Sequence, residues 1–140
     1  MDELMELRRA IVDGRYSDAL HIVDELGEMA KEDKTDKVFS YMQILLIHLI
    51  KQKAEQRTSR SWDASIQHSI HQIGRVNKRR KAGGRYMSNE ELLETLHESF
   101  TLALTQAALE AFGGVYSDQE LLAKVDKNSI VAEAMRLIEH

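Results

Sequence analysis

Residues 38–50 read VFSYMQILLIHLI, and ten of these thirteen side chains are apolar. At about 100° per residue, they surround a helix axis almost completely. A helix that is apolar on every side usually lies at the centre of a fold. The run contains His48 and is shorter than the ~20 residues that a membrane-spanning helix needs. We therefore expect a central helix over about residues 35–56 of a soluble protein.

Two amphipathic helices are predicted on the N-terminal side of this central helix. Apolar residues at helical spacing indicate one helix over residues 3–12 and a second over about 17–29. Ser17 can cap the second helix, because its hydroxyl can accept a hydrogen bond from a free amide of the first turn. The charged run 31–37 is predicted to connect this helix to the central one.

Capping signals divide the rest of the chain into further helices. A serine precedes each of three apolar runs, and two of these serines begin a capping box with a glutamate three residues later. The glycine pairs at 83–84 and 113–114 interrupt the helical pattern. No run alternates for long enough to predict a strand, so the sequence predicts an all-α fold. We expect a single α-helical domain over residues 1–140, a helical bundle of about six or seven helices. The predicted caps are Ser59 or Ser61, Ser88, Ser117 and Asn128.

The composition agrees with long helices and excludes several classes of chemistry. The chain has 140 residues and no proline, the residue that breaks helix interiors. It has no cysteine, which excludes disulfides, thiolate nucleophiles and cysteine zinc sites. The net charge of −4 gives no general attraction to nucleic acid or to a membrane. The N-terminal residues lack the basic region and apolar core of a secretory signal, so we expect a cytoplasmic protein.

Two neighbouring motifs carry a resemblance to a known family. Residues 45–51 read LLIHLIK, and residues 57–62 read RTSRSW, followed by Ile66. This order resembles the bacterial family called domain of unknown function 29. Its members show a leucine-rich helix ending in His-Leu-Leu-Lys, then Arg-Ser-x-Ser-Trp, then a second helix. Residues 23–26, VDEL, resemble the acidic pair of the same family.

The resemblance covers residues 23–73 and implies an α-helical fold and a bacterial origin. Gln52 stands where many members have tryptophan, and Ala30 where they have glycine. The proline that usually precedes the Arg-Ser stretch is absent. The resemblance implies no activity, because the family has none established.

A polar cluster is predicted around these motifs. An imidazole at His48 could act as a general base oriented by a carboxylate, or could be a buried histidine satisfied by that carboxylate. The sequence favours the structural interpretation. Arginines beside an indole could bind a phosphate or a base, whereas Trp62 could equally be a core anchor, which we favour. The candidate residues are Asp24, Glu25, His48, Lys51, Arg57, Arg60 and Trp62.

A basic segment follows, in which six of the eleven residues 75–85 are lysine or arginine and none is acidic. Such a segment could contact the phosphate backbone of a nucleic acid, with binding that falls steeply as salt rises. The alternative, which we favour, is a solvated helix end whose cations complement the helix dipole. The candidate residues are Arg75, Lys78, Arg79, Arg80, Lys81 and Arg85.

Metal and cofactor motifs are not indicated. His68 and His71 are three residues apart, but no carboxylate lies within a turn of them on the helix. Glu94 and His97 have a spacing used in helical di-iron proteins, yet Glu94 falls opposite the apolar stripe of its helix. We expect no metal, no cofactor and no assigned catalytic residue.

The sequence favours a non-catalytic protein-interaction or self-association module. An acidic chain with a basic segment has the complementary surfaces that a homo-oligomer or a protein partner needs. Binding of nucleic acid through residues 75–85 is possible but not favoured, and no membrane partner is expected. A third hypothesis is an enzyme with a pocket around His48, Arg60 and Trp62.

Overall fold

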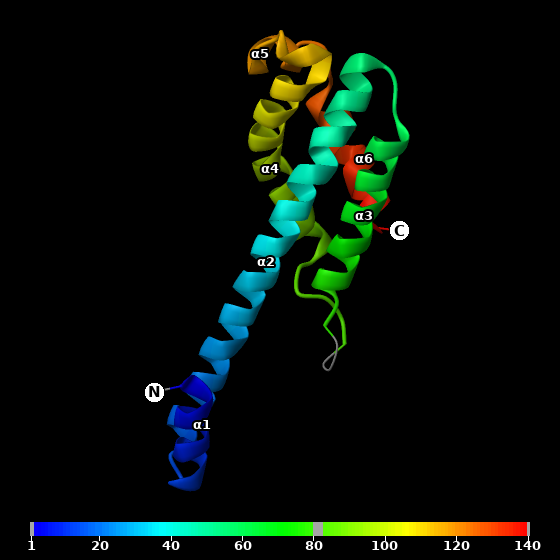
Figure 1. Cartoon of the computed structure of the whole chain (residues 1–140). Coiled ribbons are helices and arrows are strands. Elements are labelled where there is room, and N and C mark those ends of the chain that lie inside the picture. The colour runs from blue at the N-terminus through cyan, green and yellow to red at the C-terminus, as the bar shows by residue number, and fades with distance from the viewer. Residues whose placement is uncertain (1, 80–82, 140) are drawn as a thin grey trace. The chain divides into compact units, whose positions relative to one another are not determined.

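Six α-helices form the computed structural model, which describes residues 2–79 and 83–139 (Figure 1). The all-α prediction is confirmed, and the described residues contain no strand. The chain divides into two compact units, Met1–Lys34 and Thr35–His140. The elements are α1 (Glu3–Val12), α2 (Tyr16–Glu55), α3 (Arg60–Asn77), α4 (Asn89–Glu110), the 3-10 turn η1 (Ala111–Gly114), α5 (Asp118–Leu122) and α6 (Lys127–Glu139).

The predicted connection at residues 31–37 is wrong, because α2 continues through it without interruption. The run reads KEDKTDK, in which lysine and glutamate are strong helix formers and neither glycine nor proline occurs. Asp33 and Lys37 also carry opposite charges at a spacing of four residues, which favours a helix. Ser17 is therefore not a cap that starts a separate second helix, since α2 begins at Tyr16.

The first unit contains α1 and the beginning of α2, joined by a turn at Gly14. Gly14 has a φ of 76°, a conformation that suits a residue without a side chain. Asp2 caps α1, accepting a hydrogen bond from the amide of Leu4 at 2.9 Å. Among the described residues of this unit, the buried apolar side chains are Ala10 and Ala19. Its core is therefore very small.

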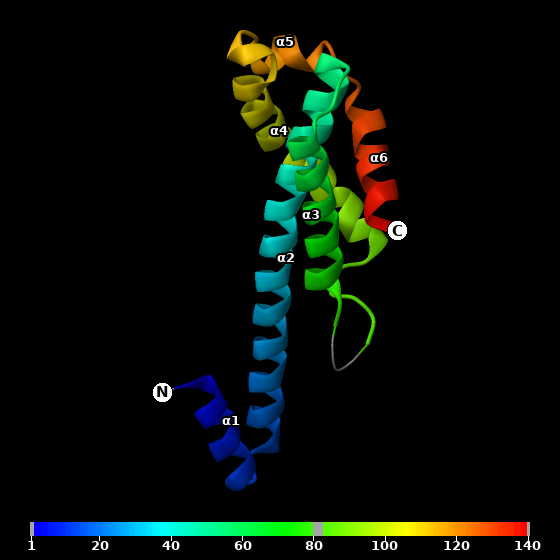
Figure 2. The same cartoon turned by 45° about the vertical axis from the view of Figure 1, so that its right-hand side comes forward.

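The second unit holds the hydrophobic core, which is built around the predicted central run. Figures 1 and 2 show this part of α2 running between α3 and α4, with α6 alongside. Helix α6 packs against both α3 and α4. The prediction that residues 38–50 occupy the centre is confirmed by their burial. The fully buried residues of this run are Val38, Met42, Leu45, Leu46, Leu49 and Ile50.

Most predicted caps are confirmed. Ser59 caps α3, and capping boxes at Ser88 and Ser117 begin α4 and α5. The predicted cap at Asn128 is wrong. The Asp126 carboxylate accepts hydrogen bonds from the amides of Asn128 and Ser129, at 3.1 and 3.3 Å, so the cap lies two positions earlier than expected.

The end of α4 requires glycine. Gly114 has a φ of 79°, and a Cβ at this position would lie 2.8 Å from the carbonyl oxygen of Leu109. That contact is closer than a side chain tolerates, so the chain turns sharply only because Gly114 has no side chain.

Across the described residues, every helix is too short or too polar to cross a membrane.

Candidate functional site

Trp62 is the centre of the predicted polar cluster. It lies in the first turn of α3, where the Ser59 hydroxyl accepts a hydrogen bond from its amide at 3.1 Å. The Lys51 ammonium lies 4.6 Å from the centre of the indole ring, and the Arg57 guanidinium lies 4.4 Å from it. The His48 ring is 6.4 Å away, centre to centre. The half-buried indole therefore attracts two cations to its ring system.

Two carboxylates neutralise these cations. The Lys51 ammonium, whose side chain is 8% exposed, donates a hydrogen bond to the Glu110 carboxylate at 2.9 Å. The Arg57 guanidinium donates to Glu55 at 2.8 Å, and the second oxygen of Glu55 accepts from the amide of Phe112 at 3.3 Å. These contacts connect α2 with the end of α4 and with η1.

The electrostatics of the cluster keep His48 neutral and Glu110 charged. Burial and the Lys51 cation lower the pKa of His48, although Glu110 acts in the opposite direction. Burial alone would raise the pKa of Glu110, but hydrogen bonds from Gln106 and Lys51 outweigh it and hold that pKa below its ordinary value. The Nδ1 atom of His48 is buried and has no hydrogen-bond partner among the described residues.

This geometry is typical of a structural junction. A general base needs a group that orients its imidazole, and Nδ1 of His48 has none. A nucleophilic lysine needs a free amine, whereas the Lys51 ammonium is held by Glu110. The cluster therefore favours the structural interpretation of these motifs.

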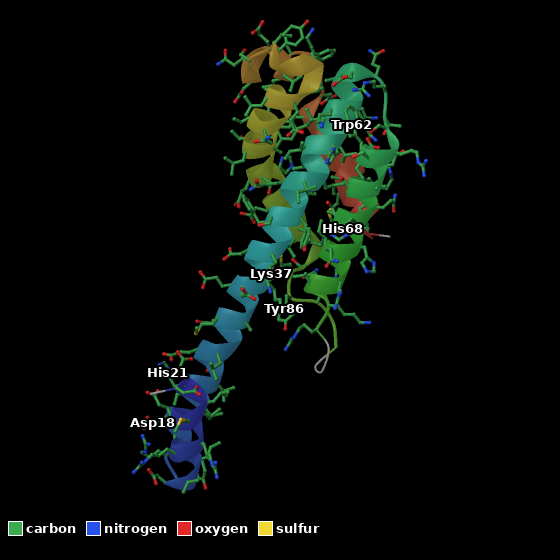
Figure 3. All side chains as sticks on the ribbon, viewed as in Figure 1. Asp18, His21, Lys37, Trp62, His68 and Tyr86 are labelled. Atoms are coloured by element: carbon green, nitrogen blue, oxygen red, sulfur yellow. The ribbon has the colours of Figure 1, made fainter. Side chains whose placement is uncertain are left out.

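Three of the predicted cluster residues do not join it. Asp24 and Glu25 belong to the first unit, where a Glu25 carboxylate oxygen lies 3.1 Å from Nε2 of His21. Figure 3 labels His21. Arg60 is exposed at the first position of α3, with no hydrogen bond or ion pair to any residue that the structure describes. The carboxylates beside the histidine and the arginine are Glu110 and Glu55 instead. Sequence reasoning missed Glu110 because it is 59 residues from Lys51, and no local signal indicates the pairing. Glu55 is only two residues from Arg57, and this proximity was a signal that sequence reasoning did not use.

Beyond Asn77, the basic segment lies in the connection between α3 and α4, called the basic loop below, and the base of this connection is fixed at the C-terminal end of α3. Figure 3 labels Trp62 and His68 on α3, and Tyr86 in the connection that follows this helix. The buried side chain of Asn77 donates to the carbonyl of Met87 at 3.1 Å and accepts from the Met87 amide at 2.7 Å. The Arg79 amide donates to the carbonyl of Gly84 at 3.0 Å. Asn77 therefore holds the two ends of the loop together.

The described cations of this segment are exposed, and none forms an ion pair with a residue that the structure describes. The Arg85 guanidinium donates to the neutral side chain of Asn89 at 2.7 Å, and that of Arg79 lies 5.9 Å from the ring centre of Tyr86. The described members are Arg75, Lys78, Arg79 and Arg85, whereas Arg80 and Lys81 lie outside the described residues.

Metal-ligating residues do not gather in the described part of the chain. No group of three histidine, aspartate or glutamate side chains there could hold a metal ion. His68 packs edge-on against Tyr41, with ring centres 6.0 Å apart, and His71 is exposed on the same helix.

Comparison with known proteins assigns the chain to a family without an established activity. No curated protein and no solved structure matches it. The family model for domain of unknown function DUF29 matches residues 13–113. This match covers more than two thirds of the chain, extending the resemblance over 23–73 to both sides, and it includes the Trp62 cluster and the basic loop. The chain therefore belongs to the family described as domain of unknown function DUF29.

Proposed function

We propose that this protein is a non-catalytic module that associates with a second copy of itself through its N-terminal helical hairpin, residues 2–34. The observation that carries this proposal is the apolar surface of the hairpin. An isolated helix as short as α1 is marginal in water, and with so small a core the hairpin has little to hold α1 against α2 unless a partner covers them. The exposed large apolar residues of the hairpin are Leu4, Met5, Ile11, Val12, Tyr16, Leu20, Val23 and Met29.

These side chains form a continuous face on each helix. On α2, Tyr16, Leu20 and Val23 follow one another at intervals of four and three residues, which places them on one stripe. On α1, a hollow of about 390 Å³ lies between Met5 and Val12, with Arg8, Arg9 and Asp13 beside them. A leucine or valine from a second hairpin would fill such a hollow.

The charges beside the two faces are complementary. On α1, Arg8 lies beside the apolar residues, and Arg9 lies 3.7 Å from the Asp13 carboxylate. On α2, Asp24 and Glu28 lie beside the apolar stripe. A two-fold axis would set α1 of each copy against α2 of the other. Arg8 of each copy would then face the acidic side chains beside the α2 stripe of its partner. The four helices would then form an antiparallel bundle with an apolar centre. This complementarity is the reason for choosing a second copy as the partner.

The test is the oligomeric state of the full chain, measured by sedimentation velocity across a range of concentrations. We expect a dimer, and we expect Leu20→Glu to weaken it. A two-fold interface contains two copies of Leu20, each contributing ~1.5 kcal/mol when buried, so the dissociation constant should rise roughly 100-fold.

Leu109→Glu is the matched control, because Leu109 is 68% exposed and Leu20 is 65% exposed. Both variants introduce the same charge on a helix surface, but Leu109 belongs to α4 of the second unit. We expect Leu109→Glu to leave the dimer intact. A chain that remains monomeric at high concentration, or a dimer that both variants weaken equally, contradicts the proposal.

A further inference from the structure

A hollow of about 440 Å³ lies along the outer face of α3, near the C-terminal end of α6. Its floor is apolar and is made by half-buried Ile70 and Ile138. Its wall is a row of polar side chains that come from successive turns of α3. These are Gln67, His71, Arg75 and Lys78.

The row in the wall consists of hydrogen-bond donors and carries positive charge. Its members recur every three or four residues, so they lie about 5–6 Å apart along the helix. Each can donate to an anionic oxygen, and arginine and lysine add permanent charge. None of the residues that line this hollow is acidic. The hollow is therefore suited to an anion that extends along α3.

A glycine lies in this row and faces open space. Gly74 lies between His71 and Arg75, and a Cβ at its position would meet nothing within 4 Å. Glycine is a poor helix former, and Gly74 is in the interior of α3 without a positive φ or a close contact that would require it. The space above Gly74 is thus available to a ligand.

The hollow ends at Lys78, beside the described cation Arg79. Lys78 belongs to both the hollow and the basic loop, and the exposed guanidinium of Arg79 lies against the ring of Tyr86 just beyond it. Flat guanidinium and aromatic groups provide surfaces on which bases stack. Residues 35–140 contain 14 lysine or arginine residues and 13 aspartate or glutamate residues, so this unit lacks the acidic excess of residues 1–34.

We propose that this hollow binds a single-stranded nucleic acid, with the phosphates on the α3 row and a sugar or base over the isoleucine floor. Cations that follow a strand, together with stacking surfaces, are the features of proteins that bind single strands without sequence preference. An acidic protein segment would also satisfy the cations, but it would not use the stacking surface. This proposal is independent of association through the N-terminal hairpin.

The experiment measures the fluorescence anisotropy of a labelled oligo-thymidine 12-mer with the full chain at several salt concentrations. We expect Arg75→Gln and Lys78→Gln each to weaken binding about tenfold, the loss of one charged hydrogen bond. Each should also reduce the slope of log affinity against log salt by ~0.7, the value for one phosphate contact on a single strand. Lys124→Gln is the matched charge control, because Lys124 follows α5, at the opposite end of the unit (Figure 1). It should change neither quantity.

Gly74→Met separates the hollow from diffuse attraction to the basic loop. The methionine side chain occupies space in the hollow beside the helix without changing any charge. Methionine also favours the helical conformation, so the variant should fold. We expect it to weaken binding at least tenfold. Three results would overturn the proposal. These are undiminished binding by Gly74→Met, no binding of the 12-mer at low salt, and tighter binding of a double-stranded 12-mer than of the single strand. Equal competition by a polyglutamate peptide overturns it in favour of an acidic protein segment.

Discussion

His48 shows how burial changes the chemistry of a single side chain. Its pKa is lowered chiefly by burial, and its Nδ1 atom has no hydrogen-bond partner among the described residues. A buried polar atom without a partner costs about 1–3 kcal/mol. The folded protein therefore favours the neutral form of this imidazole.

We expect His48→Leu to make stability less dependent on pH. The pKa of the folded histidine lies below its ordinary value of 6.5, so the unfolded chain takes up the proton first as the pH falls. The wild-type protein should lose stability from about pH 7 downwards, whereas the variant should lose less. At pH 7.5 the variant should be as stable as wild type or more stable by ~1 kcal/mol, because it removes an unpaired buried nitrogen. Urea unfolding at pH 7.5, 6.5 and 5.5 measures both effects. A steeper pH dependence in the variant contradicts the structural role of His48.

The ion pair between Lys51 and Glu110 joins two helices, α2 and α4, and its two ends differ in exposure. The Lys51 side chain is 8% exposed, whereas that of Glu110 is 38% exposed. Loss of the carboxylate therefore leaves a buried cation, and loss of the cation leaves an anion that water can reach. A buried charge without its partner is the more costly of the two.

We therefore expect Glu110→Gln to destabilise the protein more than Lys51→Met. The partial exposure of Glu110 reduces both costs from the fully buried case, to about 2 and about 1 kcal/mol. The double variant should recover part of the loss, with a coupling free energy of about 1 kcal/mol. The measurement is thermal unfolding of the wild type, the two single variants and the double variant, which together form a double-mutant cycle. Additive losses in the double variant would show that the two side chains act independently, contrary to this expectation.

For the molecule as a whole, the two units differ greatly in the size of their cores. The second unit contains nearly all of the buried apolar residues that the structure describes, although α2 belongs to both units. A segment with few buried contacts opens at low free-energy cost, even when its helix continues into a stable core.

Hydrogen exchange along α2 should reveal this difference. At concentrations where the protein is monomeric, amides of residues 17–30 should exchange at least 100-fold faster than those of residues 42–50. At concentrations where it is dimeric, the first group should become protected, because a second hairpin covers it. Pulsed exchange followed by mass spectrometry measures both groups of amides in each sample, and one sample is prepared at each of the two protein concentrations. Protection of residues 17–30 that does not change with concentration contradicts the pairing of hairpins.

Much of the helical architecture is encoded locally and can be read from the sequence. Ser59, Ser88 and Ser117 were recognisable as caps because each acts on amides two or three residues away. The central run 38–50 was recognisable because side chains around a helix follow its period. The break at residues 31–37 was wrongly predicted for a related reason: a charged run without glycine or proline favours a helix as readily as a loop.

The composition of the candidate sites depends instead on contacts between distant residues. The motif residues His48, Lys51 and Trp62 are close in sequence, but the carboxylate that neutralises Lys51 comes from Glu110. Likewise, the row of donors on α3 follows a helical period, but its apolar floor is completed by Ile138 of α6. Hydrogen bonds within a helix join residues four apart and leave a local signature, whereas packing between helices joins residues at any separation. Helix positions could therefore be deduced from the order of residues, while the partners of each side chain are established only when the helices pack.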